Sequence, residues 1–264
     1  MTYSIAKGAS GGQVNSSFST TPYAVCFTSS LINHTQVVMN KANTPTTATT
    51  VGLVTATCPA NTVLLGGGAL LTPGNTGTFK PIATFPTFNN AAHDYGRKAA
   101  ADRETNPDSG SAVGGIGGGR DSGNMTYAYA ICSGDDVNVR NITTTVHFRG
   151  LSGPEVAGTH QTATVGCDDP DGGHGNGRTH DVLVSGGAAV SGGKVTTTDF
   201  SKAGSQGTHL TGSYPSDSDG NPVSDGSTTP AYWMADIHVG GSPSPNTYSD
   251  VRALCLNLDR AGER

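Results

Sequence analysis

One glycine-rich segment, residues 168–181, holds the densest group of side chains that could bind a metal ion. Carboxylate oxygens suit calcium, whereas imidazoles combined with carboxylates suit a transition metal. No regular spacing selects either ion, and a solvated loop of this composition needs no metal at all. The candidate ligands in this segment are Asp168, Asp169, Asp171, His174, His180 and Asp181.

A second acidic segment could bind calcium through Asp217, Asp219, Asn221 and Asp225. Their D-x-D-x-N-x-x-x-D spacing resembles the first half of an EF-hand loop, in which alternate side chains converge on the ion. The segment departs from that loop at Pro222, where glycine belongs, and at Thr228, where a bidentate glutamate belongs. An ordinary turn rich in Asp, Asn, Gly and Pro explains it as well. We therefore expect no required cofactor, although calcium could bind to these loops.

Three aromatic residues, Tyr95, Tyr232 and Trp233, could supply rings on which a sugar stacks. Trp233 is the single tryptophan, and a core position explains it equally well, because sugar stacking needs an exposed ring. Together with the acidic loops, these rings predict one alternative function, a carbohydrate-binding or adhesive module with glycans as partners.

The sequence contains no recognisable catalytic arrangement. It has no G-x-S-x-G, no H-E-x-x-H and no phosphate-binding Gly-Lys-Ser/Thr motif. The glycine-rich stretch 114–119 lacks the strand-to-helix context of a nucleotide-binding loop, so we expect a flexible loop there. These observations predict a protein that is not an enzyme.

The composition predicts a β protein that binds no nucleic acid and has no membrane span. Only 13% of the 264 residues are charged, the formal net charge is -5, and 38 residues are glycine. Threonine and valine suit strands, whereas glycine disfavours helices. The 15 Lys and Arg residues are scattered, which argues against binding to phosphates. No apolar run reaches the roughly 18 residues that a membrane-spanning helix needs.

An internal repeat organises the chain, which indicates two diverged copies of one unit. Three segments read as a strand that runs into a cysteine, and two pairs of segments match each other between the copies. The three are 22–26, 127–132 and 251–255; the matched pairs are 54–58 with 162–167 and 63–69 with 182–188. The glycines that follow Leu65 interrupt an apolar run, which predicts a bulge or a bend in that strand.

The fold class that follows is all-β, with two tandem, duplicated β-sandwich or barrel-like units joined by long glycine-rich loops. Residues 1–21 are expected to form an extended tail, residues 22–132 the first unit with an extra leading strand, and residues 133–264 the second unit. The longest loops are expected at 168–181 and around 106–124.

Five cysteines at repeat-related positions predict disulfides within each unit and an oxidising compartment. One pairing joins Cys58 to Cys132 and Cys167 to Cys255, which leaves Cys26 unpaired or available for an intermolecular bond. The other joins Cys26 to Cys58 and Cys132 to Cys167, which leaves Cys255. The first is preferred because it closes each copy around its own glycine-rich strand.

The N-terminal tail suggests a role in assembly, because Tyr3 and Ile5 alternate with polar residues as in a strand. Such a tail could add to an open sheet edge of a neighbouring copy and build a filament. The expected function is therefore an extracellular or cell-surface structural protein that assembles with itself. A phage fibre or decoration protein, with a virion surface as its location, is a further alternative.

Overall fold

The structure of this protein is a computed structural model, and all regular structure in its described residues is β. It describes residues 19–29, 32, 34–46, 51–72, 79–89, 98–116, 123–134, 142–167, 181–191, 207–228, 230–240 and 246–258. None of these residues is helical, so the described ranges contain no helix that could cross a membrane.

Thirteen strands are described, and they fall into two halves of the chain. The first half contains β1 (Gln36–Asn43), β2 (Val51–Thr57), β3 (Leu64–Thr72), β4 (Phe79–Phe88), β5 (Lys98–Ala99), β6 (Ser109–Ile116) and β7 (Met125–Cys132). The second half contains β8 (Ile142–Ser152), β9 (His160–Gly166), β10 (Val182–Ser191), β11 (Thr208–Ser216), β12 (Tyr232–Val239) and β13 (Tyr248–Leu258).

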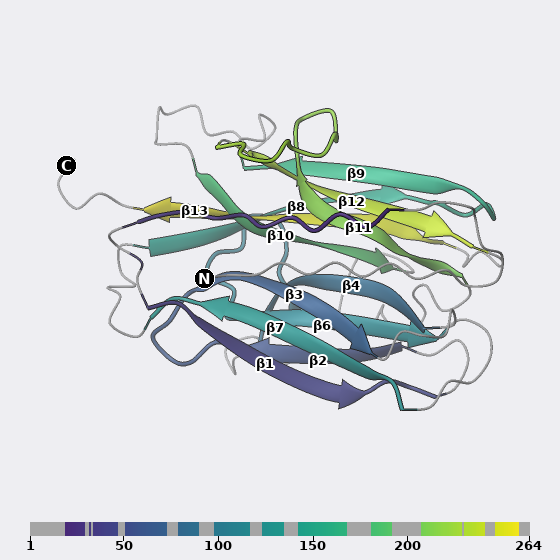
Figure 1. Ribbon diagram of the computed structural model, residues 1–264, viewed down its shortest axis with the longest axis horizontal. Helices are drawn as coiled ribbons and strands as arrows, with labels where there is room; N and C mark the ends of the chain where they lie inside the picture. Colours follow the sequence, from purple (N-terminus) through teal and green to yellow (C-terminus); the bar gives the residue numbers. More distant parts are fainter. Residues whose placement is uncertain are drawn as a thin grey trace.

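The strands form three sheets (Figure 1). The first outer sheet has the order β1-β7-β3, the second outer sheet β11-β12-β9, and the central sheet β2-β6-β4-β10-β13-β8, with β5 paired to β4. The two halves share one strand order, because β1-β7-β3 corresponds to β8-β13-β10 and β2-β6-β4 to β9-β12-β11. The all-β class predicted from composition is confirmed, with each half built as two packed layers.

Bulges recur at the same places in both halves. The register of β3 against β7 shifts between Leu64 and Gly66, and that of β10 against β13 shifts between Leu183 and Ser185. These segments are the ones that the sequence matches to each other. The bulge predicted from the glycines after Leu65 is therefore present, and it lets the strand bend over the core.

The two halves are joined through the backbone of the central sheet. Strand β10 pairs with β4 through Ala188 opposite Thr84 and Ala189 opposite Ala83. Gly187 lies so close to β4 that a Cβ atom there would be 2.3 Å from the carbonyl oxygen of Thr84. Glycine is the residue that permits this approach, and the halves consequently form one continuous sheet.

Two hydrophobic cores lie on opposite faces of the central sheet. Alternate residues of β13 enter different cores: Val251 and Ala253 pack with the second outer sheet, whereas Leu254 packs with Leu64 of the first outer sheet. Because side chains alternate across a strand, this division places the two outer sheets against opposite faces. Each core contains residues from both halves, so neither core is formed by one half alone.

A buried arginine lies where the halves meet. Arg252 is 2% exposed, its Nε donates to the carbonyl oxygen of Ala100 at 2.9 Å, and its guanidinium lies 4.6 Å from the ring centre of Phe148. The ring of Phe85 lies 5.4 Å away on β4. Burial lowers the pKa of Arg252 to about 10, so the side chain stays charged at neutral pH and is stabilised by cation–π contacts.

One predicted loop is instead a buried strand. The residues around 106–124 were expected to form a glycine-rich loop, but β6 occupies Ser109–Ile116 and all eight of its residues are buried. A Cβ atom on Gly110 would lie 2.4 Å from the carbonyl oxygen of Tyr129, and one on Gly114 would lie 2.4 Å from Thr126 Oγ1. The glycines therefore allow β6 and β7 to pack closely. The loop prediction was wrong because these glycines serve close packing between strands and not the flexibility of a loop.

Candidate functional site

The outer edge of β8 is covered by another part of the chain. Residues 101–106, from the first half, run along it: Arg103 N–H donates to Val146 O at 2.7 Å, Val146 N–H to Glu104 O at 2.9 Å and Asn106 N–H to Thr144 O at 2.7 Å. These bonds satisfy backbone groups that an edge strand would otherwise present to a partner.

Strand β1 occupies the corresponding position in the first half, and among the described residues its outer edge is open. It pairs with β7 on one side, and no residue in the described ranges pairs with it on the other. Its last five residues are exposed. Val37 is 64% exposed and Met39 is 47% exposed, so this edge carries apolar side chains as well as unpaired backbone.

The orientation of β1 follows from its alternate residues. Val38 packs against the core, and Asn40 Nδ2 donates to the carbonyl oxygen of Thr55 on β2 at 2.8 Å. Val37, Met39 and Lys41 therefore point outward. They lie opposite Ile131, Tyr129 and Tyr127 of β7, and Lys41 Nζ lies 5.7 Å from the ring centre of Tyr127.

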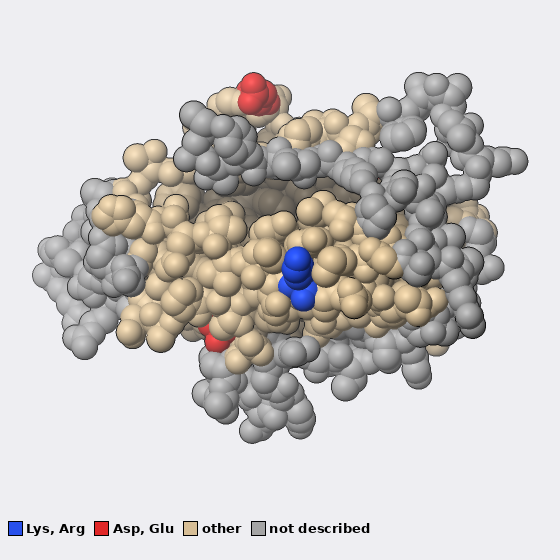
Figure 2. Space-filling view, turned by 60° about the horizontal axis from the view of Figure 1, so that its bottom comes forward, with Lys and Arg blue, Asp and Glu red and all other residues tan. Residues whose placement is uncertain are grey.

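Few charges lie among the described residues on this side of the molecule. Figure 2, which brings the lower side of Figure 1 forward, shows mostly uncharged described residues, with one group of Lys or Arg atoms near the centre and small groups of Asp or Glu atoms toward the margins. Natural edge strands are normally blocked by lysines, prolines, bulges or a covering segment. The β1 edge, with Lys41 as its one lysine, is a candidate surface for adding another strand.

The segment that precedes β1 lies across both halves. The ring of Tyr23 stacks on Tyr214 of β11 with centroids 5.6 Å apart, and Phe27 packs against the core of the first half. In Figure 1 this dark purple segment crosses the second half before the chain turns toward β1. Residues 22–29 alternate between exposed and partly buried, but the leading strand predicted over 22–26 is not a strand, because its backbone joins no sheet.

The cysteines pair as the preferred sequence interpretation predicts. Disulfides join Cys58 to Cys132 and Cys167 to Cys255. Each bond links an outer sheet to the central sheet within one half. Cys26 is free and exposed, so its thiol faces solvent instead of packing as a buried apolar group.

The acidic segment 217–225 is a locally bonded turn. Asp217 Oδ1 accepts hydrogen bonds from the backbone N–H groups of Asp219 at 2.9 Å and Asn221 at 2.8 Å, and Asn221 Nδ2 donates to Asp217 Oδ2 at 3.1 Å. These bonds lower the pKa of Asp217. They account for the Asp and Asn residues as turn formers, while Asp225 makes no bond with this group in the described contacts.

Of the remaining predicted site residues, the structure describes Asp181, Tyr232 and Trp233. Asp181 Oδ1 accepts a hydrogen bond from Asn257 Nδ2 at 2.8 Å. Within the described ranges, no three His, Cys, Asp or Glu side chains are placed to hold a metal ion together. The predictions for Tyr3, Ile5, Tyr95, Asp168, Asp169, Asp171, His174 and His180 lie outside the described residues.

Both described rings pack over glycines. Trp233 points toward the core, where its ring fills the space beside Gly186, and its Nε1 donates to Ser213 Oγ at 2.9 Å. The ring of Tyr232 lies over Gly166 of β9. Trp233 is thus part of the packing between β12 and β10.

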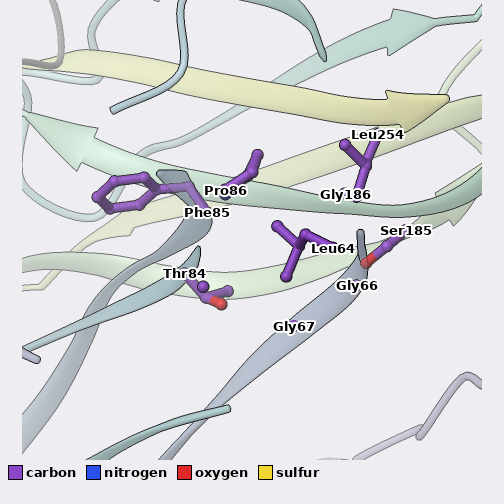
Figure 3. A pocket seen from close by; sticks show the side chains of 10 residues that line it. Leu64, Gly66, Gly67, Thr84, Phe85, Pro86, Ser185, Gly186 and Leu254 are labelled. Carbon is purple, nitrogen blue, oxygen red and sulfur yellow. The ribbon is translucent and has the colours of Figure 1, made fainter. Parts of the chain in front are cut away.

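A small pocket lies where β3, β4 and β10 meet (Figure 3). Leu64, Phe85, Pro86 and Leu254 line it together with backbone at Gly66 and Gly186. Its volume of about 10 Å³ is roughly that of one water molecule's accessible space. The pocket marks the joint between the halves and has no room for a small-molecule ligand.

A row of three histidines crosses the outer face of the second outer sheet. His209 of β11 lies opposite His238 of β12, which lies opposite His160 of β9. The rings of His209 and His238 are 5.5 Å apart, edge to face. The pKa of His209 is lowered to about 4, mainly by burial and then by the positive charge of Lys80 on β4; the bond to Gly207 O raises it, and the neighbouring His238 lowers it slightly.

The low pKa of His209 predicts a loss of stability in acid. Between pH of roughly 6.5 and 4 the unfolded chain binds a proton at this residue and the folded chain does not, so stability falls as pH falls. The loss amounts to at most about 3 kcal/mol. His209→Gln should reduce the difference between the free energies of unfolding measured in urea at pH 7 and at pH 4.5. An equal difference for the variant and the wild type would contradict the prediction.

No family model matches the chain, and no curated protein sequence matches it. The functional interpretation therefore depends on the fold and its surfaces.

Sequence reasoning missed two of these surfaces. Nothing local in the sequence shows that the strand at 36–43 lies at the edge of its sheet, without a described partner on its outer side. The histidines at 160, 209 and 238 are far apart in the chain, and the register between strands brings them into one row.

Proposed function

We propose that this protein is an extracellular structural subunit that assembles into a filament or fibre by strand addition at the β1 edge. The observation that carries the proposal is the contrast between equivalent edges. Residues 101–106 cover β8, whereas no described residue pairs with the outer edge of β1, where Val37 and Met39 are exposed. Edge strands of this kind pair with strands of other chains.

The donor in this proposal is the N-terminal segment 1–21 of a neighbouring copy. Its alternation around Tyr3 and Ile5 suits a strand with one apolar face. A contact between the tail of one copy and β1 of the next joins two different surfaces, and repetition of such a contact builds an open filament. Main-chain hydrogen bonds would supply affinity, and burial of Val37 and Met39 would add about 1 kcal/mol each.

Two further features support a surface location and a duplicated origin. Disulfides persist in oxidising compartments, and this chain has one in each half. The two halves share strand order, bulge positions and disulfide placement, which supports descent from one duplicated six-stranded unit.

A phage fibre subunit could use the same edge on a virion. In the described ranges, no contact favours the glycan-binding alternative.

Charges placed on the β1 edge should abolish assembly. The double variant Val37→Lys/Met39→Lys adds two charges to side chains that are 64% and 47% exposed, so the fold should be retained. We expect sedimentation velocity and electron microscopy to show filaments or oligomers for the wild type and monomers for this variant. The matched control is Val156→Lys, because Val156 is also 64% exposed but lies outside the edge.

Removal of residues 1–21 tests the donor separately. If the tail donates the strand, the truncated protein should be monomeric alone and should cap filaments of the full chain, because its β1 edge is intact. Wild-type protein that stays monomeric at high concentration would overturn the proposed function. Filaments that survive the truncation but not the β1 variant would retain the acceptor edge and reject the tail as donor.

A further inference from the structure

We propose that His209 and His238 form a binding site for a divalent transition metal ion, with His160 as the third protein ligand. The site lies on the outer face of the second outer sheet, away from β1, and does not depend on the proposed assembly. Its basis is the row of three imidazoles in register across β11, β12 and β9. Neighbouring strands lie about 4.8 Å apart, so imidazoles on adjacent strands can reach one ion.

The hydrogen bond of His209 determines which of its nitrogens is free. Its Nδ1 lies 2.8 Å from the carbonyl oxygen of Gly207. A carbonyl oxygen only accepts hydrogen bonds, so the proton must be on Nδ1 and the lone pair on Nε2. Histidines that bind metals commonly donate their second nitrogen to a carbonyl in this way, which orients the ring.

Two glycines hold the carbonyl that orients His209. Gly207 has a φ of +119°, a conformation that side chains rarely allow. The amide of Gly240, at the end of β12, also donates to Gly207 O at 2.9 Å. The acceptor is thus fixed by the backbone of both strands that carry the histidine pair.

The donor atoms and the nearby charge determine which ion suits the site. The positive charge of Lys80 acts on His209 and opposes the ion, which weakens the site. Imidazole donors suit zinc, copper and nickel, whereas calcium and magnesium prefer oxygen. Zinc is therefore a suitable probe.

The third ligand must turn toward the pair when the ion binds. The described side chains do not bring three ligands together in their present conformations, and His160 is exposed at the start of β9. Its position opposite His238 places it within one strand spacing. We expect two imidazoles to supply most of the affinity, and His160 and water to complete the coordination.

The test is titration of the metal-free full chain with zinc chloride, observed by calorimetry and by NMR of the histidine side chains. The sequence has eight histidines, so the NMR signals are needed to locate the ion. Wild type should show zinc-dependent shifts at His209 and His238. His209→Gln and His238→Gln should each weaken this binding at least roughly tenfold, and His160→Gln by less.

Two variants separate metal binding from general effects. Lys80→Gln should tighten zinc binding several-fold, because it removes a positive charge near the ion; a merely structural role for the histidines would not produce this gain. His34→Asn serves as the control, since His34 is exposed and asparagine tolerates its φ of 48°. Unchanged zinc affinity in His238→Gln, or no zinc shifts at His209 and His238 in the wild type, would overturn the proposal.

Discussion

Replacement of Gly187 by alanine should weaken the joint between the two halves more than any conservative change at the surface. A Cβ atom at this position would lie 2.3 Å from Thr84 O and 2.7 Å from Phe85 Cα. Both are backbone atoms of β4, so no side-chain rotation can relieve the clash. Movement of β4 would disrupt its pairing with β10 at Ala188 and Ala189. We expect the free energy of unfolding to fall by about 3 kcal/mol.

Equilibrium unfolding in urea measures this effect, and Gly68→Ala is its matched control. Gly68 also lies in a strand, β3, but a Cβ atom there would meet nothing within 4 Å. We expect the control to stay within about 0.5 kcal/mol of the wild type. Equal losses in the two variants would show that the close approach of β10 and β4 does not determine stability.

Loss of either disulfide should have the largest effect on stability. Cys167 and Cys255 are separated by 88 residues and Cys58 and Cys132 by 74, so each bond closes a long loop. The chain-entropy relation assigns about 4 kcal/mol to loops of this length. We expect Cys167→Ala/Cys255→Ala to lower the melting temperature by about 10 °C, and Cys58→Ala/Cys132→Ala to do nearly the same.

Cys26→Ala is the internal control for these variants. Cys26 is free and exposed, so its replacement should leave the melting temperature unchanged. Thermal unfolding followed by circular dichroism, in the absence of reductant, compares all three variants with the wild type. A Cys26→Ala variant as unstable as the paired variants would contradict the pairing, and so would wild-type protein whose stability does not change on reduction.

Several features of this fold could be predicted from the sequence because they are properties of short segments or of matched segments. Low charge with abundant Thr, Val and Gly indicates strands. The match between 63–69 and 182–188 predicted equivalent strands, and both carry a bulge at the same place. The cysteine positions within the repeat also selected the pairs Cys58–Cys132 and Cys167–Cys255. Each of these inferences compares residues along the chain and needs no knowledge of distant contacts.

Other features depended on packing between distant segments. The glycines of β6 were interpreted as a loop. Their role is to leave space for Tyr129 and Thr126 of β7, and this role is visible only when the sheets are packed. Segment 22–26 has the alternating residue pattern of a strand, but a strand also needs a neighbouring strand to pair with. Tyr23 packs its ring on Tyr214 instead. The carboxylate of Asp217 accepts hydrogen bonds from the backbone N–H groups of Asp219 and Asn221 in a turn.

The sequence by itself determined the β class of this protein and favoured the disulfide pairing that the structure has. Only the tertiary structure decided that residues 101–106 cover β8 while no described residue covers the outer edge of β1, and that His160, His209 and His238 share one row. The physical reason is that strand pairing joins residues far apart in the chain. Which edge remains unpaired, and which side chains meet across a sheet, depends on the register and order of all the strands together.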